Sequence, residues 1–240
     1  MKKALAIILA VALLCIMAVG TTLTYFTDTD FDKNTMAVGK VEIIQNETDR
    51  AGNSFADAKL YPYTGVAGEE GKTTEYGTYK MFDTEKNAID KIVTVTLDAN
   101  SEDAFVRTIF AFEADGTADA VGSKIFLNVN ANSNIGVWAQ CKDAQDKPIT
   151  YTKTVDGVEI IYYLYSFTYA AKFSAGNTTE PSLLQFYLNG NAENGFSGGS
   201  YEILAVSQAV QSTGFANAAD AFAAAFPYGE NNANVANWFN

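Results

Sequence analysis

The amino-acid sequence predicts an all-β protein: an antiparallel, jelly-roll-like β-sandwich with a short helix in its C-terminal region, preceded by an N-terminal signal helix. Apolar residues between residues 40 and 210 recur mostly at every second position, which is the period of a strand with one buried face. Turns rich in Gly, Asn and Asp separate roughly eight or nine such runs, a number typical of sandwiches and jelly rolls.

The N-terminus has the three parts of a secretory signal. Lys2 and Lys3 are followed by an uncharged run over residues 4–20 and then by small residues. The uncharged stretch continues to Thr27, so a retained membrane anchor is the alternative, because about 20 apolar residues span a bilayer as a helix. We expect removal, since Gly20 and several threonines weaken the distal end and no basic cluster follows it.

These features predict a signal peptide over residues 1–24, removed by a signal peptidase, and a protein secreted to the extracellular matrix or cell surface. Cleavage after Gly20 and cleavage after Thr24 both follow a small-x-small pattern, so both positions stay open. The cleavage region comprises four residues: Gly20, Thr22, Thr24 and Tyr25. The membrane is then a partner only through the unprocessed signal.

Composition disfavours nucleic-acid binding and most enzyme mechanisms. The formal net charge is −12, and loss of Lys2 and Lys3 makes the mature chain −14, which repels phosphate backbones and anionic lipids. The chain has no histidine, which excludes histidine-dependent triads and zinc sites. Its carboxylates form no recognisable glycosidase pair. We therefore predict no enzyme activity, no catalytic residue and no cofactor.

An acidic run after the signal has only the first part of a calcium loop. Asp28, Asp30 and Asp32 alternate, as the oxygen ligands of such a loop do. Lys33 stands where the loop needs its turn glycine, and Gly39 stands where a bidentate glutamate would close the ligand shell. We assign no metal site to this segment.

The predicted strands follow along the mature chain. Residues 92–97 alternate cleanly, and residues 105–113 place aromatic residues on one face and Arg107 and Glu113 on the other. Asp156-Gly157 predicts a tight hairpin turn, because glycine accepts the positive φ that this turn needs. Further strands are predicted over residues 40–44, 124–129, 135–141, 148–153, 158–169, 183–188 and 201–210.

One segment breaks the period of two. Residues 215–226 are rich in alanine and place three phenylalanines near one helical stripe, which predicts a short amphipathic helix. Pro227 ends it. Cys141, the single cysteine that remains after processing, lies in an apolar run, and we expect a buried, inert thiol.

Three segments of the chain carry a resemblance to known proteins. The signal is followed by Tyr25-Phe26-Thr27-Asp28 and then by residues 34–43, NTMAVGKVEI. The other two segments are residues 103–108, DAFVRT, and residues 209–226, which open with Ala-Val-Gln and contain the alanine-rich helix. Together they are similar to the TasA/camelysin family, secreted biofilm-matrix fibre proteins of Firmicutes whose signal peptide is cleaved by a dedicated signal peptidase. Residues 130–200 match only in character.

The resemblance implies a jelly-roll domain that assembles into extracellular fibres by donor-strand exchange, in which the N-terminal segment of one subunit completes the sheet of the next. It implies residues 25–45 as the arm and first (donor) strand, and residues 46–240 as the sandwich domain. The implied partners are further copies of the chain, the signal peptidase and sister matrix proteins. Camelysin-like proteins are also a metallopeptidase family, but a chain without histidine departs from any histidine-dependent zinc mechanism.

The arm is long enough to reach a neighbouring subunit. Residues 25–44 extend to about 65 Å at about 3.3 Å per residue, whereas a domain of this size has a radius of gyration of about 17 Å. Backbone groups of the arm would supply affinity, and alternating side chains would fill pockets of the recipient. We assign that second role to five residues: Phe26, Met36, Val38, Val41 and Ile43.

A monomeric cell-surface or envelope-associated binding module is the alternative from a different functional class. Its ligand face would be the tyrosine-rich strand that carries Tyr162, Tyr163, Tyr165 and Tyr169. Cross-strand aromatic packing explains the same residues without a ligand. An envelope or spore-coat protein without filaments is the third hypothesis.

Overall fold

The structure is a computed structural model that describes most of the chain after residue 40. It describes residues 27–30 as backbone, together with residues 41–56, 58–65, 74–190, 192, 201–227, 235, 238 and 239. The predicted signal peptide, residues 1–24, lies outside the described residues. No helix in the described part of the chain is long and apolar enough to cross a membrane.

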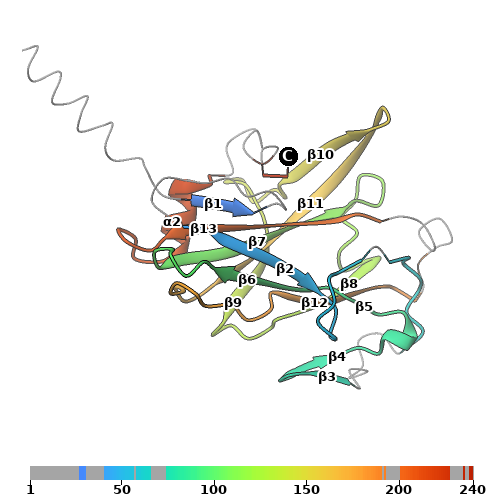
Figure 1. Cartoon of the computed structure of the whole chain (residues 1–240). Coiled ribbons are helices and arrows are strands. Elements are labelled where there is room, and N and C mark those ends of the chain that lie inside the picture. The colour runs from blue at the N-terminus through green and yellow to red at the C-terminus, as the bar shows by residue number, and fades with distance from the viewer. Residues whose placement is uncertain are drawn as a thin grey trace, which may run out of the picture.

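The largest sheet has six strands, and each strand runs antiparallel to its neighbours (Figure 1). Its order is β1 (Thr27–Asp30), β13 (Ile203–Gln211), β7 (Ala104–Glu113), β11 (Val158–Tyr169) and β10 (Thr150–Val155), with β9 (Gly136–Gln140) also paired to β11. β10 pairs with residues 158–163 of β11, and β9 pairs with residues 165–169. The long strand β11 therefore carries two shorter strands in succession along one edge.

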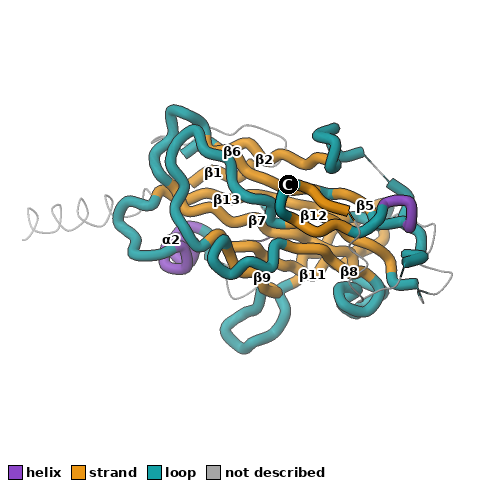
Figure 2. The backbone as a smooth tube through the Cα atoms, turned by 90° about the horizontal axis from the view of Figure 1, so that it is seen from below, coloured by secondary structure: helices purple, strands orange, loops and turns teal. Residues whose placement is uncertain are grey.

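A second group of strands packs against the large sheet. β2 (Ile43–Thr48) pairs with β6 (Ile92–Leu97), while β12 (Leu183–Leu188) pairs with β5 (Ile89–Asp90) and β8 (Ile125–Val129). Backbone hydrogen bonds join the two pairings, since Thr179 N donates to Val95 O at 2.8 Å and Ser182 N donates to Val93 O at 2.9 Å. Figure 2 shows the strands side by side in the middle and the loops around them. The other described elements are β3 (Thr74–Tyr76), β4 (Tyr79–Met81), the 3-10 helix η1 (Thr84–Lys86) and α2 (Ala218–Ala225).

The main core lies between the large sheet and the β2–β6 pair. Val95 and Leu97 of β6, Phe110 and Phe112 of β7 and Phe167 of β11 belong to it, and each is at most 1 % exposed. The alternation of each strand sends these side chains to one face, where burial of apolar surface stabilises the contact between the layers. The predicted period of two therefore has its cause in this core.

β7 is buried on both faces, although its sequence pattern places Arg107 and Glu113 opposite the aromatic face. Ile109 and Ala111 of the outer face are fully buried, and Arg107 is only 5 % exposed. α2 and the C-terminal residues Val235, Trp238 and Phe239 cover this face. Alternation within β7 cannot reveal the cover, because the covering segments lie far along the chain.

The all-β class is confirmed, and β6, β11 and β12 have the bounds that the sequence predicts. The Asp156-Gly157 turn is also confirmed, with φ of 51° and 82°. α2 begins at Ala218, later than residue 215, because the Asn217 side chain caps it by accepting a hydrogen bond from Asp220 N at 2.9 Å. The predicted boundary between arm and domain, at residues 45 and 46, falls inside β2.

Truncation of a core side chain tests the layer contact. We expect Phe110→Ala to lower the free energy of unfolding by about 3–5 kcal/mol, because it leaves a cavity between β7 and β6. Val137→Ala, at a position 59 % exposed, should cost under about 1 kcal/mol. Urea denaturation followed by tryptophan fluorescence measures both, and equal midpoints for the two variants would contradict the assigned core.

Candidate functional site

The N-terminal strand β1 forms one edge of the large sheet. It pairs antiparallel with β13, from Thr27 opposite Val210 to Asp30 opposite Ser207. The four β13 residues in this register, Ser207 to Val210, are all 0 % exposed. Because an uncovered edge leaves backbone groups without partners, β1 supplies hydrogen bonding where β13 is most deeply buried.

Gln45 of β2 covers the neighbouring part of the same edge. Its side-chain amide donates from Nε2 to Ala205 O at 3.2 Å, and Ser207 Oγ donates to its Oε1 at 2.6 Å. β2 thus reaches β13 through one side chain rather than through a backbone ladder. Together, β1 and Gln45 cover the outer edge of β13 from residue 205 to residue 210.

On the outer face of the large sheet beside this edge, Arg107 packs beneath aromatic rings. Arg107 Nε donates to Gln208 Oε1 at 2.8 Å, which ties β7 to β13 through their side chains. The guanidinium carbon lies 4.5 Å from the ring centroid of Phe222 and 5.5 Å from that of Trp238, within cation–π range. The end of the sheet that holds Thr27 is therefore packed under α2.

The predicted donor side chains have different locations. Val41 and Ile43 are 0 % and 2 % exposed and belong to the main core of their own chain, with Val95 and Leu97. Three residues lie outside the described residues: Phe26, Met36 and Val38. The predicted cleavage region, made of Gly20, Thr22, Thr24 and Tyr25, also lies outside them.

β1 lies within residues 25–45, the segment expected to form the arm and first (donor) strand, but its own pairing with β13 was not predicted. The segment reads Thr-Asp-Thr-Asp and has no apolar alternation, because the edge of β13 and not a buried face determines its pairing. A signal was present in β13 itself, whose nine residues are rich in small and β-branched types and need a partner on each side. The residues that pair with β1, Ser207 to Val210, were not predicted to do so either.

Arg50 makes hydrogen bonds within its own chain. Its Nε and Nη2 donate to Asp90 Oδ2 at 2.6 Å and to Asp90 Oδ1 at 2.9 Å, and Nη2 also donates to Phe82 O at 2.8 Å. The hydrogen bond to Asp90 raises the pKa of Arg50, so the charge is held by this contact. Asp90 in turn accepts from Gln185 Nε2 at 2.9 Å, which links the loop after β2 to β12.

The tyrosine-rich strand is packed rather than presented to solvent. Tyr162 and Tyr169 are fully buried, and the Tyr165 ring lies 6.1 Å from Trp138. Tyr163 is half-buried and donates from its hydroxyl to Thr117 O at 2.8 Å. Burial raises the pKa of Tyr169 to about 12 and also raises the pKa of Tyr162.

These tyrosines predict loss of stability in alkali. A folded-state pKa above the unfolded value of about 10 means that the folded protein holds the proton more tightly, so stability is complete below pH ~10 and falls as pH rises toward ~12. We expect urea midpoints to fall over this interval. Tyr169→Phe should reduce the slope, and an unchanged slope would contradict the role given to Tyr169.

In the part of the chain that the structure describes, no group of three or more His, Cys, Asp or Glu residues is placed to hold a metal ion. Cys141 is 3 % exposed, so its predicted burial is confirmed. Comparison with models of protein families, with curated proteins and with solved structures finds no match for this chain. The function is therefore inferred from the sheet edge and from the sequence before it.

Proposed function

We propose that this chain is a secreted structural protein of the extracellular matrix or cell surface, and that it assembles into fibres by exchange of β1 between copies. The observation that carries the proposal is the pairing of β1 with β13, in which a short segment near the N-terminus covers a fully buried strand edge. The donor segment is then residues 27–30, and the acceptor is the edge of β13 from Ser207 to Val210.

The pairing within one chain is short, so it opens more readily than the rest of the sheet. β13 pairs with β7 along nine residues but with β1 along four. A backbone hydrogen bond contributes about 0.5–1.5 kcal/mol net, and terminal segments open at a fraction of the global unfolding free energy. The same residues from another copy restore the same register, so exchange is nearly neutral locally and is favoured by rising concentration.

The chain between β1 and the core is long enough for exchange. Residues 31–40 separate β1 from Val41, the first described core residue, and extend to about 33 Å at about 3.3 Å per residue. This is roughly twice the radius of gyration of about 17 Å for a domain of this size. Because Val41 and Ile43 hold the start of β2 in their own core, we place the exchanged part before Val41, where Phe26, Met36 and Val38 lie.

A contact in which each copy gives one strand and receives another is heterologous, and it generates a filament unless it closes into a ring. The attached signal peptide would hold the arm at the membrane, which confines assembly to the outside of the cell. We further propose that the chain is a relative of the TasA/camelysin family, with its strands connected as a jelly roll. The function as proposed needs no catalytic residue, cofactor or metal.

A monomeric binding module has less support. Its ligand face would use the tyrosines of β11, but Tyr162 and Tyr169 are fully buried and Tyr165 is stacked against Trp138. Side chains already committed to cross-strand packing offer little surface to a ligand.

Removal of the arm is the first test of the fibre. A chain from Tyr25 to Asn240 should form filaments visible by electron microscopy at high concentration, and a chain that lacks residues 25–39 should form none. The truncated chain leaves the buried β13 edge without its strand, so we also expect it to be less stable to urea. If both chains stay monomeric under every condition of pH and salt, the proposal fails.

Two single prolines sharpen this test. In an antiparallel ladder, neighbouring residues alternate between pairs that exchange both backbone hydrogen bonds and pairs that exchange none. Asp28 and Thr29 are neighbours, so the backbone N–H of only one of them points toward β13. Proline lacks the N–H, so Asp28→Pro and Thr29→Pro should differ. The proline that removes the ladder hydrogen bond should strongly reduce the rate of filament growth, and the other proline is its matched control. Equal growth of both variants and the parent chain would show that β1 does not pair in the fibre.

The acidic charge predicts a dependence of assembly on pH. A mature charge of −14 per subunit repels at close spacing, and the sequence pI is about 4.4. Since the chain has no histidine, light scattering should change little between pH 8 and ~6 and should rise as the carboxylates take up protons toward pH ~4.5. Added salt should raise scattering at pH 7 by screening. Scattering that is constant over the whole pH range would remove charge repulsion from the account.

A further inference from the structure

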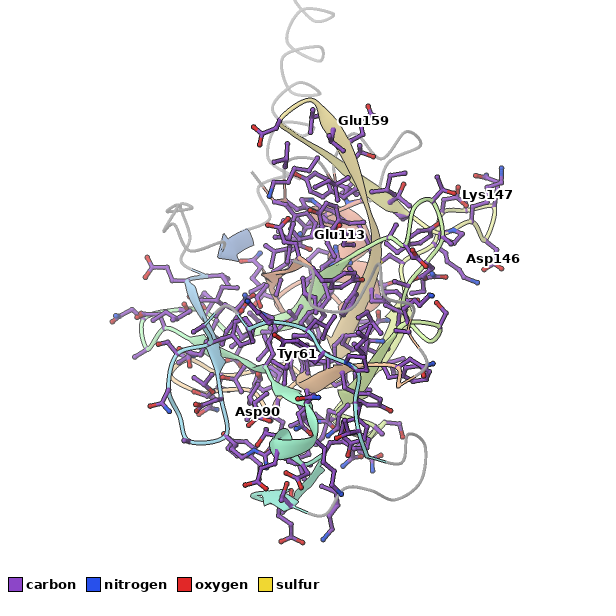
Figure 3. All side chains as sticks on the ribbon, turned by 90° about the vertical axis from the view of Figure 1, so that its right-hand side faces the viewer. Tyr61, Asp90, Glu113, Asp146, Lys147 and Glu159 are labelled. Carbon is purple, nitrogen blue, oxygen red and sulfur yellow. The ribbon has the colours of Figure 1, made fainter. Side chains whose placement is uncertain are left out.

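A hairpin projects from one end of the large sheet. β11 pairs with β7 only from Tyr162 to Thr168, so its residues 158–161 extend beyond β7 and keep β10 as their described strand neighbour. Figure 1 shows this β10–β11 hairpin standing out from the body, and Figure 3 places Glu159 on it at the top of the molecule. Its tip exposes two apolar side chains, Val155 at 39 % and Val158 at 63 %.

The apolar residues of the tip share one face. Val155 lies directly opposite Val158 across the Asp156-Gly157 turn, and directly opposed residues of an antiparallel pair point to the same side. Ile160 follows Val158 on that face and packs against the core under the C-terminal residues. An apolar strip therefore runs from the outer core to the tip. The Asp156 carboxylate stands exposed at its end.

A largely apolar groove lies at the other end of β11. It has a volume of about 710 Å³ and lies between α2 and the ends of β9 and β11. Its lining includes Val137 of β9, Thr168 of β11, and Ala219, Phe222 and Ala223 of α2. Arg107 also lines it and carries the only charge among the described lining residues. The groove thus combines apolar walls with one cation.

The tip and the groove lie on the same face of β11. Residues 158, 160, 162, 164, 166 and 168 alternate to one side of the strand, so Val158 at the tip and Thr168 in the groove share that side. They are about 33 Å apart at about 3.3 Å per residue. A displacement along β11, combined with the rotation that the strand's own twist imposes, would therefore carry the tip of one copy toward the groove of the next. Such a contact is heterologous and repeats without closing.

We infer that the β10–β11 hairpin tip of one copy docks into the α2 groove of another copy, with Val155 and Val158 against the apolar walls and the Asp156 carboxylate toward Arg107. The charges are complementary, and the projecting valines gain the cover that their own chain does not give them. The inference rests on the proposed function in one respect, which is that the occupant of the groove is a second copy of this chain. The hairpin takes no part in strand exchange.

Charge substitutions on both sides of the contact test it in the chain from Tyr25 to Asn240. Val158→Asp at the tip and Ala223→Glu in the groove should each raise the concentration needed for assembly by at least about tenfold, since each adds a second carboxylate to an apolar contact in which Arg107 already faces Asp156. Thr154→Asp, on the opposite face of the hairpin, and Ala224→Glu, exposed on α2 but outside the groove lining, are the matched controls. All four substituted positions are exposed, so each variant should fold. Urea denaturation midpoints for each variant verify this.

Cross-linking separates this contact from strand exchange. A mixture of Val158→Cys and Ala223→Cys chains, both lacking residues 25–39, should form a disulfide-linked heterodimer under mild oxidation, identified by its mass. Val158→Cys mixed with Ala224→Cys should not. Filaments that form normally from the Val158→Asp and Ala223→Glu chains, with no cross-link in either mixture, would overturn the hairpin contact and leave strand exchange standing. Dodecanoate that binds the groove equally well before and after assembly would overturn it too, because the groove would then be a ligand site.

Discussion

The need to cover the outer edge of β13 is the constraint on which the rest of the structure depends. β13 is paired along its whole length with β7, and its residues from Val206 to Val210 have no exposed surface. A strand so deeply buried cannot leave its backbone groups unpaired, because each would cost the free energy of desolvation without a compensating bond. The chain meets this need twice, with the backbone of β1 and with the side chain of Gln45.

Much of the sheet structure could be predicted because its cause is local. The alternation of residues 92–97 and the long apolar run of residues 158–169 reflect the core that each strand contacts, and their bounds are those of β6 and β11. The burial of Arg107 could not be predicted from β7 alone. Its cover comes from α2 and from Trp238, which meet β7 only in the folded chain. The same holds for the pairing of Arg50 with Asp90.

The candidate site was harder to predict than the fold for a related physical reason. Alternating residues such as Val41 and Ile43 fit a strand of their own sheet as well as a strand given to a neighbour, because both environments bury the same face. The structure places these two side chains in their own core. β1, in contrast, has no apolar pattern, so its pairing depends entirely on the edge it meets. If β1 is the donor segment proposed above, it is recognised from the edge of β13 with which it pairs rather than from its own pattern.

The antiparallel register of β1 on β13 also has a mechanical consequence. In the proposed fibre, a pull along the axis of β1 would act on its pairing with β13. The hydrogen bonds of the four opposed pairs then lie across the pull and are loaded together in shear, instead of being peeled apart one after another. A strand of four residues can thus resist an axial force that would separate it easily if the force were applied perpendicular to the strand. A fibre built in this way would be strong along its length and weak to forces perpendicular to it.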